Sequence, residues 1–294
     1  MTAHSSWHPQ LRSFRLTLIL TAIIAAGVFS FRDCSADEPI EFKGHKEVVY
    51  DGKFFPDGKS LVTASFDQTL KLWDIATQSS LRTMEGHTGI VLTVDVSPNG
   101  KMIASGSSDR TIRLWDVPSS DPVSTTRIHD TPVTAMATSK DGSLTATGDD
   151  KGLIRVWTTA ISGGNSTSSA TDQSKPASEI SIGRAITRLA WRNDNKKLAA
   201  ACVDGSVVVA SLSVDGPNQI DRLIAHVGEV TCVSFTPNNQ YLFSCGADGY
   251  VRRWPSTISR ALTYEGAAKP ATALAIHPKG TVIAVAGEDG SAKI

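Results

Sequence analysis

The sequence predicts an all-β protein built from repeated antiparallel sheets, and three observations lead to this expectation. Trp73, Trp115 and Trp157 follow one another at intervals of 42 residues, and Trp254 follows 97 residues later, which fits two periods plus an insertion. Each period contains short runs rich in valine, isoleucine, leucine and threonine, separated by turns such as the Pro-Asp-Gly at 56–58. A lone four-stranded sheet cannot bury both of its faces, so we expect the repeats to pack radially.

The same motif recurs around each tryptophan. Residues 65–74 read Ser-Phe-Asp-Gln-Thr-Leu-Lys-Leu-Trp-Asp, and residues 107–116 read Ser-Ser-Asp-Arg-Thr-Ile-Arg-Leu-Trp-Asp. A Gly-His pair lies upstream in the first two copies, at 44–45 and 86–87. A period of about 40–45 residues with Gly-His and Trp-Asp is typical of the WD40 repeat, and residues 39–294 resemble that family. The resemblance implies a β-propeller, in which four-stranded sheets (blades) surround a central axis.

Counting the acidic residue before each tryptophan position gives six blade units. These residues are Asp67, Asp109, Asp150, Asp204, Asp248 and Asp289. The last unit is truncated, because residues 289–294 stop one residue before the position of the expected tryptophan. Seven blades are the commonest number in the family that this sequence resembles. We therefore expect the intact protein to have seven, with residues 39–43 supplying the outer strand of the final blade.

The resemblance also implies a buried network in each blade, joining a histidine, a strand serine or threonine, the acidic residue and the tryptophan indole. It maps onto His45, Asp67 and Trp73; His87, Asp109 and Trp115; His129, Asp150 and Trp157; and His226, Asp248 and Trp254. Such a network satisfies buried polar atoms, and no nucleophile recurs beside it, so we interpret it as structural. Ile182 and Ala210 replace the histidine and tryptophan of the fourth unit, and Ala267 replaces the histidine of the sixth. We expect apolar packing alone to hold these two units.

Partners of the family usually dock on the face that carries the Gly-His loops. Three positions per blade point to that face: the third and fifth residues after the histidine, and the residue before the acidic residue. In the first two blades, five of these six positions hold Val48, Tyr50, Phe66, Ile90 and Leu92. An exposed apolar patch of this kind marks an interaction site, so we expect these residues to bind a protein or peptide. The alternative is that these side chains turn inward beneath a loop.

Residues 1–36 have the pattern of a secretory signal peptide. Arg12 and Arg15 precede an apolar run at 16–31, and the small residues Ser35 and Ala36 follow it. This run is shorter than the roughly 20 residues that span a bilayer as a helix. We expect cleavage near Ala36 and a periplasmic or extracellular location, with a membrane anchor formed by residues 16–31 as the alternative. Residues 37–294 then form the propeller, with a flexible Ser/Thr/Gly-rich loop at 161–178.

Charge and composition narrow the functions to be expected. The chain has 29 basic and 29 acidic residues, so its charge gives no basis for binding nucleic acid, and membrane contact is expected only if the N-terminal segment is not cleaved. Cleavage would leave Cys202, Cys232 and Cys245, an odd number in apolar strand patterns, which we interpret as buried thiols rather than a disulfide framework.

No catalytic signature stands out in the sequence. It has no phosphate-binding loop, nucleophile elbow or zinc-type spacing, so we expect no enzyme activity, no cofactor and no metal. The sequence therefore predicts an exported, non-catalytic scaffold that binds a protein or peptide. The alternative is an exported propeller enzyme, or the sensory or binding half of a larger enzyme whose catalytic domain is absent from this chain.

Overall fold

The computed structural model describes residues 41–117, 121–127, 129–158, 176–213, 218–256, 262–265 and 269–294. The expected signal segment, most of the 161–178 loop and Ala267 lie outside these residues. The described residues form strands, turns and bends, arranged as six antiparallel sheets. In this part of the chain there is no helix of sufficient length and hydrophobicity to cross a bilayer.

Strand order within every sheet follows the chain without crossovers. The first sheet consists of β1 (Val49–Phe54), β2 (Ser60–Ser65), β3 (Leu70–Asp74) and β4 (Ser79–Met84). The second consists of β5 (Val91–Val96), β6 (Met102–Ser107), β7 (Thr111–Asp116) and β8 (Pro122–Arg127). The third consists of β9 (Val133–Thr138), β10 (Leu144–Asp149), β11 (Leu153–Thr158) and β12 (Ser178–Ser181).

The remaining three sheets continue this pattern, except that the last has three strands. The fourth sheet consists of β13 (Ile186–Trp191), β14 (Lys197–Cys202), β15 (Ser206–Ser211) and β16 (Gln219–Ile224). The fifth consists of β17 (Val230–Phe235), β18 (Tyr241–Gly246), β19 (Tyr250–Pro255) and β20 (Leu262–Glu265). The sixth consists of β21 (Ala271–Ile276), β22 (Ile283–Gly287) and β23 (Ala292–Lys293).

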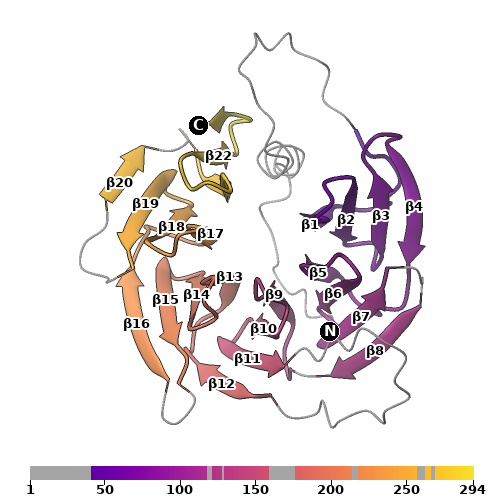
Figure 1. Cartoon of the computed structure of the whole chain (residues 1–294), viewed down its shortest axis with the longest axis horizontal. Helices are drawn as coiled ribbons and strands as arrows, with labels where there is room; N and C mark the ends of the chain where they lie inside the picture. The colour runs from indigo at the N-terminus through magenta and orange to yellow at the C-terminus, as the bar shows by residue number, and fades with distance from the viewer. Residues whose placement is uncertain are drawn as a thin grey trace, which may run out of the picture.

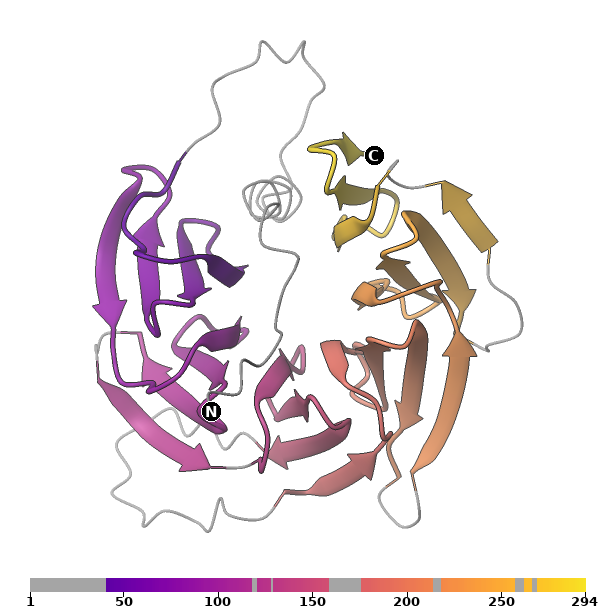
Figure 2. The same cartoon turned by 180° about the vertical axis from the view of Figure 1, so that it is seen from behind.

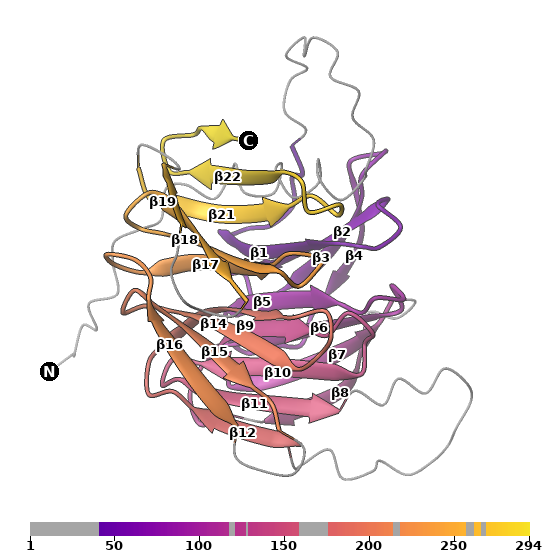
Figure 3. The same cartoon turned by 60° about the vertical axis from the view of Figure 1, so that its left-hand side comes forward.

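The sheets are arranged around a central axis as a six-bladed β-propeller. The inner strands β1, β5, β9, β13, β17 and β21 pack against one another in chain order, and the fourth strands lie on the periphery (Figures 1 and 2). Figure 3 shows the same succession from the side. No seventh sheet occurs among the described residues, and the ring is open between the first and sixth sheets.

The outer strand expected at 39–43 is not found in its described part, because residues 41–43 contain no strand. Phe42 instead packs edge-on against Trp73 of the first sheet, with ring centroids 5.6 Å apart. The aromatic contact therefore keeps this segment beside the first sheet.

The hairpin turn predicted from the Pro-Asp-Gly triplet at 56–58 is present. In the turn between β1 and β2, the N–H of Gly58 donates to the carbonyl of Phe55 at 3.0 Å, and the carboxylate of Asp57 accepts the N–H of Lys59 at 2.9 Å. Gly58 has a φ of +66°, which favours glycine over residues with a Cβ. Tight turns of this kind bring consecutive strands into antiparallel register.

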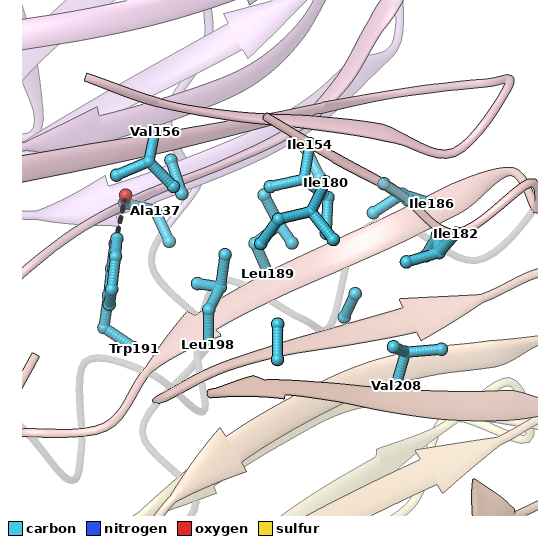
Figure 4. Close-up of a cluster of buried hydrophobic side chains, with 14 of the residues drawn as sticks. Ala137, Ile154, Val156, Ile180, Ile182, Ile186, Leu189, Trp191, Leu198 and Val208 are labelled. Atoms are coloured by element: carbon cyan, nitrogen blue, oxygen red, sulfur yellow. Dashed lines mark hydrogen bonds between the residues drawn. The ribbon is translucent and has the colours of Figure 1, made fainter. Parts of the chain in front are cut away.

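Apolar residues pack between neighbouring sheets. Five clusters among the described residues each join one sheet to the next in chain order. The largest joins the third and fourth sheets and includes Ile154, Ile186 and Leu198 (Figure 4). Burial of such side chains stabilises each by about 1.5–3 kcal/mol relative to exposure.

The fourth sheet is held by more than the apolar packing expected from its sequence. Trp191 on its inner strand donates the indole N–H to the carbonyl of Ala137 in the third sheet at 2.9 Å (Figure 4). Arg184 and Arg222 also pair with the carboxylate of Asp204, at 2.6 and 2.7 Å. Polar contacts at other positions thus accompany the loss of the histidine and tryptophan.

Candidate binding face

A series of hydrogen bonds connects the tryptophan of the first sheet to the loop before its inner strand. The indole of Trp73 donates to Thr63 Oγ1 at 2.8 Å, and Thr63 Oγ1 lies 2.7 Å from His45 Nε2. His45 Nδ1 lies 2.8 Å from Asp67 Oδ2, which also accepts the N–H of Lys46 at 3.0 Å. This order fits a neutral histidine that donates from Nδ1 and accepts at Nε2.

The second, third and fifth sheets repeat this series. The His–Asp distances are 2.8 Å for His87–Asp109, 3.0 Å for His129–Asp149 and 2.7 Å for His226–Asp248. The indoles donate to hydroxyls at 2.9 Å for Trp115–Ser105, 3.1 Å for Trp157–Thr147 and 3.1 Å for Trp254–Ser244. Four sheets therefore fix their Gly-His loops, or the equivalent loops, by the same means.

In the third sheet the acidic partner is Asp149, and the assignment of Asp150 is wrong. Besides His129, the carboxylate of Asp149 accepts the N–H groups of Lys151 and Leu153 at 3.0 and 2.8 Å. Lys151 stands where the other copies have the acid, in the turn that follows β10, and Asp149 at the end of β10 supplies the carboxylate in its place. Asp150 Oδ1 is buried without a hydrogen-bond partner among the described residues.

Burial and hydrogen bonding within the network shift the pKa values of its histidines and aspartates. Burial raises the pKa of Asp67, but hydrogen bonds from Thr69 and His45 outweigh that effect and lower the pKa to about 2. Burial lowers the pKa of His45 and of His226, and their hydrogen bonds to aspartate only partly oppose the shift. Both shifts favour an ionised aspartate beside a neutral histidine.

The expected anchor residues Val48, Tyr50, Phe66, Ile90 and Leu92 are all half-buried. The rings of Tyr50 and Phe66 stack, with centroids 5.6 Å apart and planes 20° apart. The N–H of Phe66 donates to the carbonyl of Val48 at 2.9 Å, so these three residues form one unit of the first sheet. Ile90 and Leu92 lie at the corresponding positions of the second sheet.

Ion pairs between inner strands connect different sheets, either neighbouring ones or ones on opposite sides of the ring. Arg188 Nη2 on β13 lies 3.5 Å from Asp51 Oδ1 on β1, which joins the fourth sheet to the first. Lys53 Nζ lies 3.8 Å from Asp95 Oδ1 on the neighbouring inner strand. Burial raises the pKa of Tyr50, and the charge of Arg188 opposes that shift. The aromatic pair thus lies beside a zone of paired charges.

Cys232 differs from the inert thiol that its apolar strand predicts. A hydrogen bond with Cys245 lowers the pKa of Cys232 against the effect of burial, and the cations of Arg188 and Lys53 contribute to the same shift. Burial, in contrast, raises the pKa of Cys202 to about 11. The sequence carries no signal for this difference, because the two cations come from other sheets.

A polar pocket of about 550 Å³ lies between the first and second sheets, beside their two Gly-His loops. It is lined by Gly44, Lys46, Asp67, Gln68, Thr69, Lys71, Thr83, Glu85, Gly86 and His87. Among the described residues, no group of three or more histidine, cysteine, aspartate or glutamate side chains is arranged to hold a metal ion.

The fold and its repeated networks define a propeller of the class that typically serves as a protein-interaction scaffold. The family model "WD domain, G-beta repeat" matches residues 38–74, 78–116, 120–158, 217–255 and 259–294, which is more than half of the chain. The chain therefore belongs to the WD40-repeat family, as its motifs predict. Strands β13, β14 and β15 of the fourth sheet lie outside the matched segments, in agreement with Ile182 and Ala210 at its network positions.

A curated relative is also similar. The "Probable cytosolic iron-sulfur protein assembly protein CIAO1 homolog" of Caenorhabditis elegans is 34% identical over 71 residues, which are 24% of this chain and 21% of the relative. The match thus spans about a fifth of that protein's length, and it shows similarity of repeats.

We expect Asp149→Ala to lower the free energy of unfolding by about 1–3 kcal/mol, because it leaves His129 and two backbone N–H groups unpaired. Asp109→Ala should cost a similar amount for the same reason. Asp150→Ala is the matched control and should not lower stability, because it removes a buried oxygen that has no hydrogen-bond partner among the described residues. Urea unfolding of the three variants checks this, and equal losses for Asp149→Ala and Asp150→Ala would contradict the assignment.

Stability should fall as the pH is lowered, in two stages. The pKa values of His45 and His226 in the folded protein lie below their ordinary value of 6.5, so the unfolded chain takes up protons first as the pH falls through that value. A second loss should follow below the ordinary value of 3.8 for Asp67, whose folded pKa is about 2. Thermal unfolding between neutral and acidic pH measures both. A His226→Gln variant should lose less stability between about pH 7 and 5, and stability that rose on acidification would contradict the direction of these pKa shifts.

Proposed function

We propose that this protein is an exported, non-catalytic WD40 propeller that binds a protein or peptide on its Gly-His-loop face. The observation that carries the proposal is the fixing of that face by four networks. Each buried carboxylate of the first, second and fifth sheets accepts a backbone N–H of the loop itself, from Lys46, Thr88 and Val227 at 3.0, 3.0 and 3.2 Å. A surface held rigid before binding loses little conformational entropy when a partner docks.

The stacked rings of Tyr50 and Phe66 are the proposed anchors of the first sheet. Aromatic side chains contribute much of the affinity at interfaces, because they bury a large area and lose few rotamers. The stack already restricts both rings, so they meet a partner in a defined orientation. The neighbouring charges of Arg188 and Asp51 would supply polar contacts around an apolar centre.

Tyr50→Ala and Phe66→Ala should each weaken partner binding by about 2 kcal/mol or more while the fold is kept. The measurement is a pull-down from the exported fraction with the whole chain as bait, followed by affinity determination for the recovered partner. Leu81→Ala is the control, because Leu81 is exposed on the outer strand of the first sheet. Wild-type affinity in both aromatic variants would exclude them as anchors.

Export is proposed from the basic, apolar and small-residue pattern of residues 1–36. Expression of the full chain in a bacterial host with a periplasm should give a product in the periplasmic fraction whose mass corresponds to cleavage near Ala36. Intact-mass analysis of each fraction checks this. A full-length product in the membrane fraction would instead support an anchor at 16–31, and a full-length cytosolic product would contradict export.

A further inference from the structure

A group of exposed apolar side chains lies on the Gly-His-loop face, over the fourth and fifth sheets. Val203, Ile224, Val227 and Tyr250 are 49, 87, 81 and 41% exposed. These four residues, here called the rim patch, expose more apolar surface than the half-buried anchors of the first two sheets. Large exposed apolar side chains gathered on one surface mark an interaction site.

Backbone contacts hold the rim patch together. The carbonyl of Gly205, in the turn after Val203, accepts the N–H of His226 at 2.8 Å. A Cβ at position 205 would lie 2.2 Å from the carbonyl oxygen of His226, and φ is +83°, so only glycine allows this approach. On the other side, the carboxylate of Asp248 accepts the N–H groups of Val227 and Tyr250, each at 3.2 Å. The loop carrying Val227 is thus fixed between two turns.

The other repeats carry polar residues at most of these positions, so the fold does not require apolar ones. The position of Ile224 holds Lys43 and Glu85 in the first two copies, that of Val227 holds Lys46 and Thr88, and that of Tyr250 holds Thr69 and Thr111. The apolar character is therefore a property of this part of the ring.

Tyr250 is accommodated by a change in the network beneath it. In the first sheet, the hydroxyl of Thr69 donates to the carboxylate of Asp67 at 2.7 Å. In the fifth sheet, Arg252 Nη1 donates to Asp248 Oδ2 at 2.8 Å, and its guanidinium lies 5.4 Å from the centre of the Tyr250 ring. A cation–π contact thus supports the ring from below, and the ring remains at the surface.

Positive charge lies beside the rim patch. Arg184 Nε and Arg222 Nη2 both pair with Asp204 Oδ2, at 2.6 and 2.7 Å. Two guanidinium groups share one carboxylate, so one positive charge remains uncompensated within the cluster. Arg222 lies two residues before Ile224 on β16, which places both side chains on the same face of that strand.

We propose that the rim patch and the Arg184–Asp204–Arg222 cluster bind a peptide segment of a partner in which an apolar side chain is flanked by carboxylates. The apolar side chain packs against Val227 and Tyr250, and a carboxylate pairs with Arg222, whose planar donors suit it. This inference rests on the proposed function of the face, and it adds the location of the subsite and the chemistry of its ligand.

The probe is a set of short peptides selected from a random display library on the immobilised full chain. We expect the selected peptides to combine a large apolar residue with neighbouring aspartate or glutamate. Their affinity should fall about tenfold or more in a Val227→Thr, Tyr250→Thr double variant, which installs the residues that the second sheet carries at these positions. Arg222→Gln should remove the preference for an acidic peptide over its amide analogue. Leu81→Thr, on the outer strand of the first sheet, is the control and should bind as wild type does.

The outcomes separate this inference from the proposed function. Selected peptides that bind the double variant normally but lose affinity for Tyr50→Ala would overturn the rim patch and leave the binding face intact. Peptides without acidic residues, or an unchanged preference in Arg222→Gln, would overturn the electrostatic part. Failure of the library to yield any binding peptide would overturn the subsite, while the pull-down with the full partner would still test the face. Unchanged thermal unfolding of each variant verifies that its fold is kept.

Discussion

The hydrogen-bond series from indole to hydroxyl to imidazole to carboxylate is the constraint on which the binding face depends. In the first sheet it joins Trp73 on β3, Thr63 on β2 and His45 in the loop before β1, so it ties together three segments of one blade. Its polar atoms are shielded from water, and a missing member would leave a buried donor or acceptor unpaired. The loops that it holds are therefore rigid for a reason separate from the apolar packing between sheets.

The departures from this series are equally informative. The fourth sheet lacks the histidine and the tryptophan, and Trp191 instead donates to a carbonyl of the preceding sheet. The fifth sheet lacks the threonine, and Arg252 supplies a donor to Asp248. In both cases a buried polar group keeps a partner, although a different residue provides it. The fold thus requires that each of these buried polar groups has a hydrogen-bond partner, while the residue that provides it, and the surface next to it, can vary.

The sequence predicts the fold well because the periodic features are local. The tryptophan spacing, the Gly-His pairs and the turn triplets each report on one blade, and their order determines the propeller. The acid of the third blade is an exception, because Lys151 stands at its position and the spacing alone does not show which of the two preceding aspartates pairs with His129. The contacts of Arg188 with Asp51 and of Cys232 with its cations join different sheets, so no spacing within one repeat predicts them.

Burial explains why the predicted anchors and the most exposed apolar residues differ. The family positions lie next to the inner strands, where neighbouring sheets converge and cover part of every side chain, as for Tyr50 and Phe66. Ile224 and Tyr250 belong to strands farther from the axis, where the sheets diverge and leave side chains uncovered. A partner that contacted only the centre would leave the apolar surface of the rim in water. A segment extending outward over the fourth and fifth sheets would bury the apolar surface at the centre and at the rim. The positive charge of the Arg184–Asp204–Arg222 cluster would then favour apolar segments that carry acidic residues over those that carry basic ones.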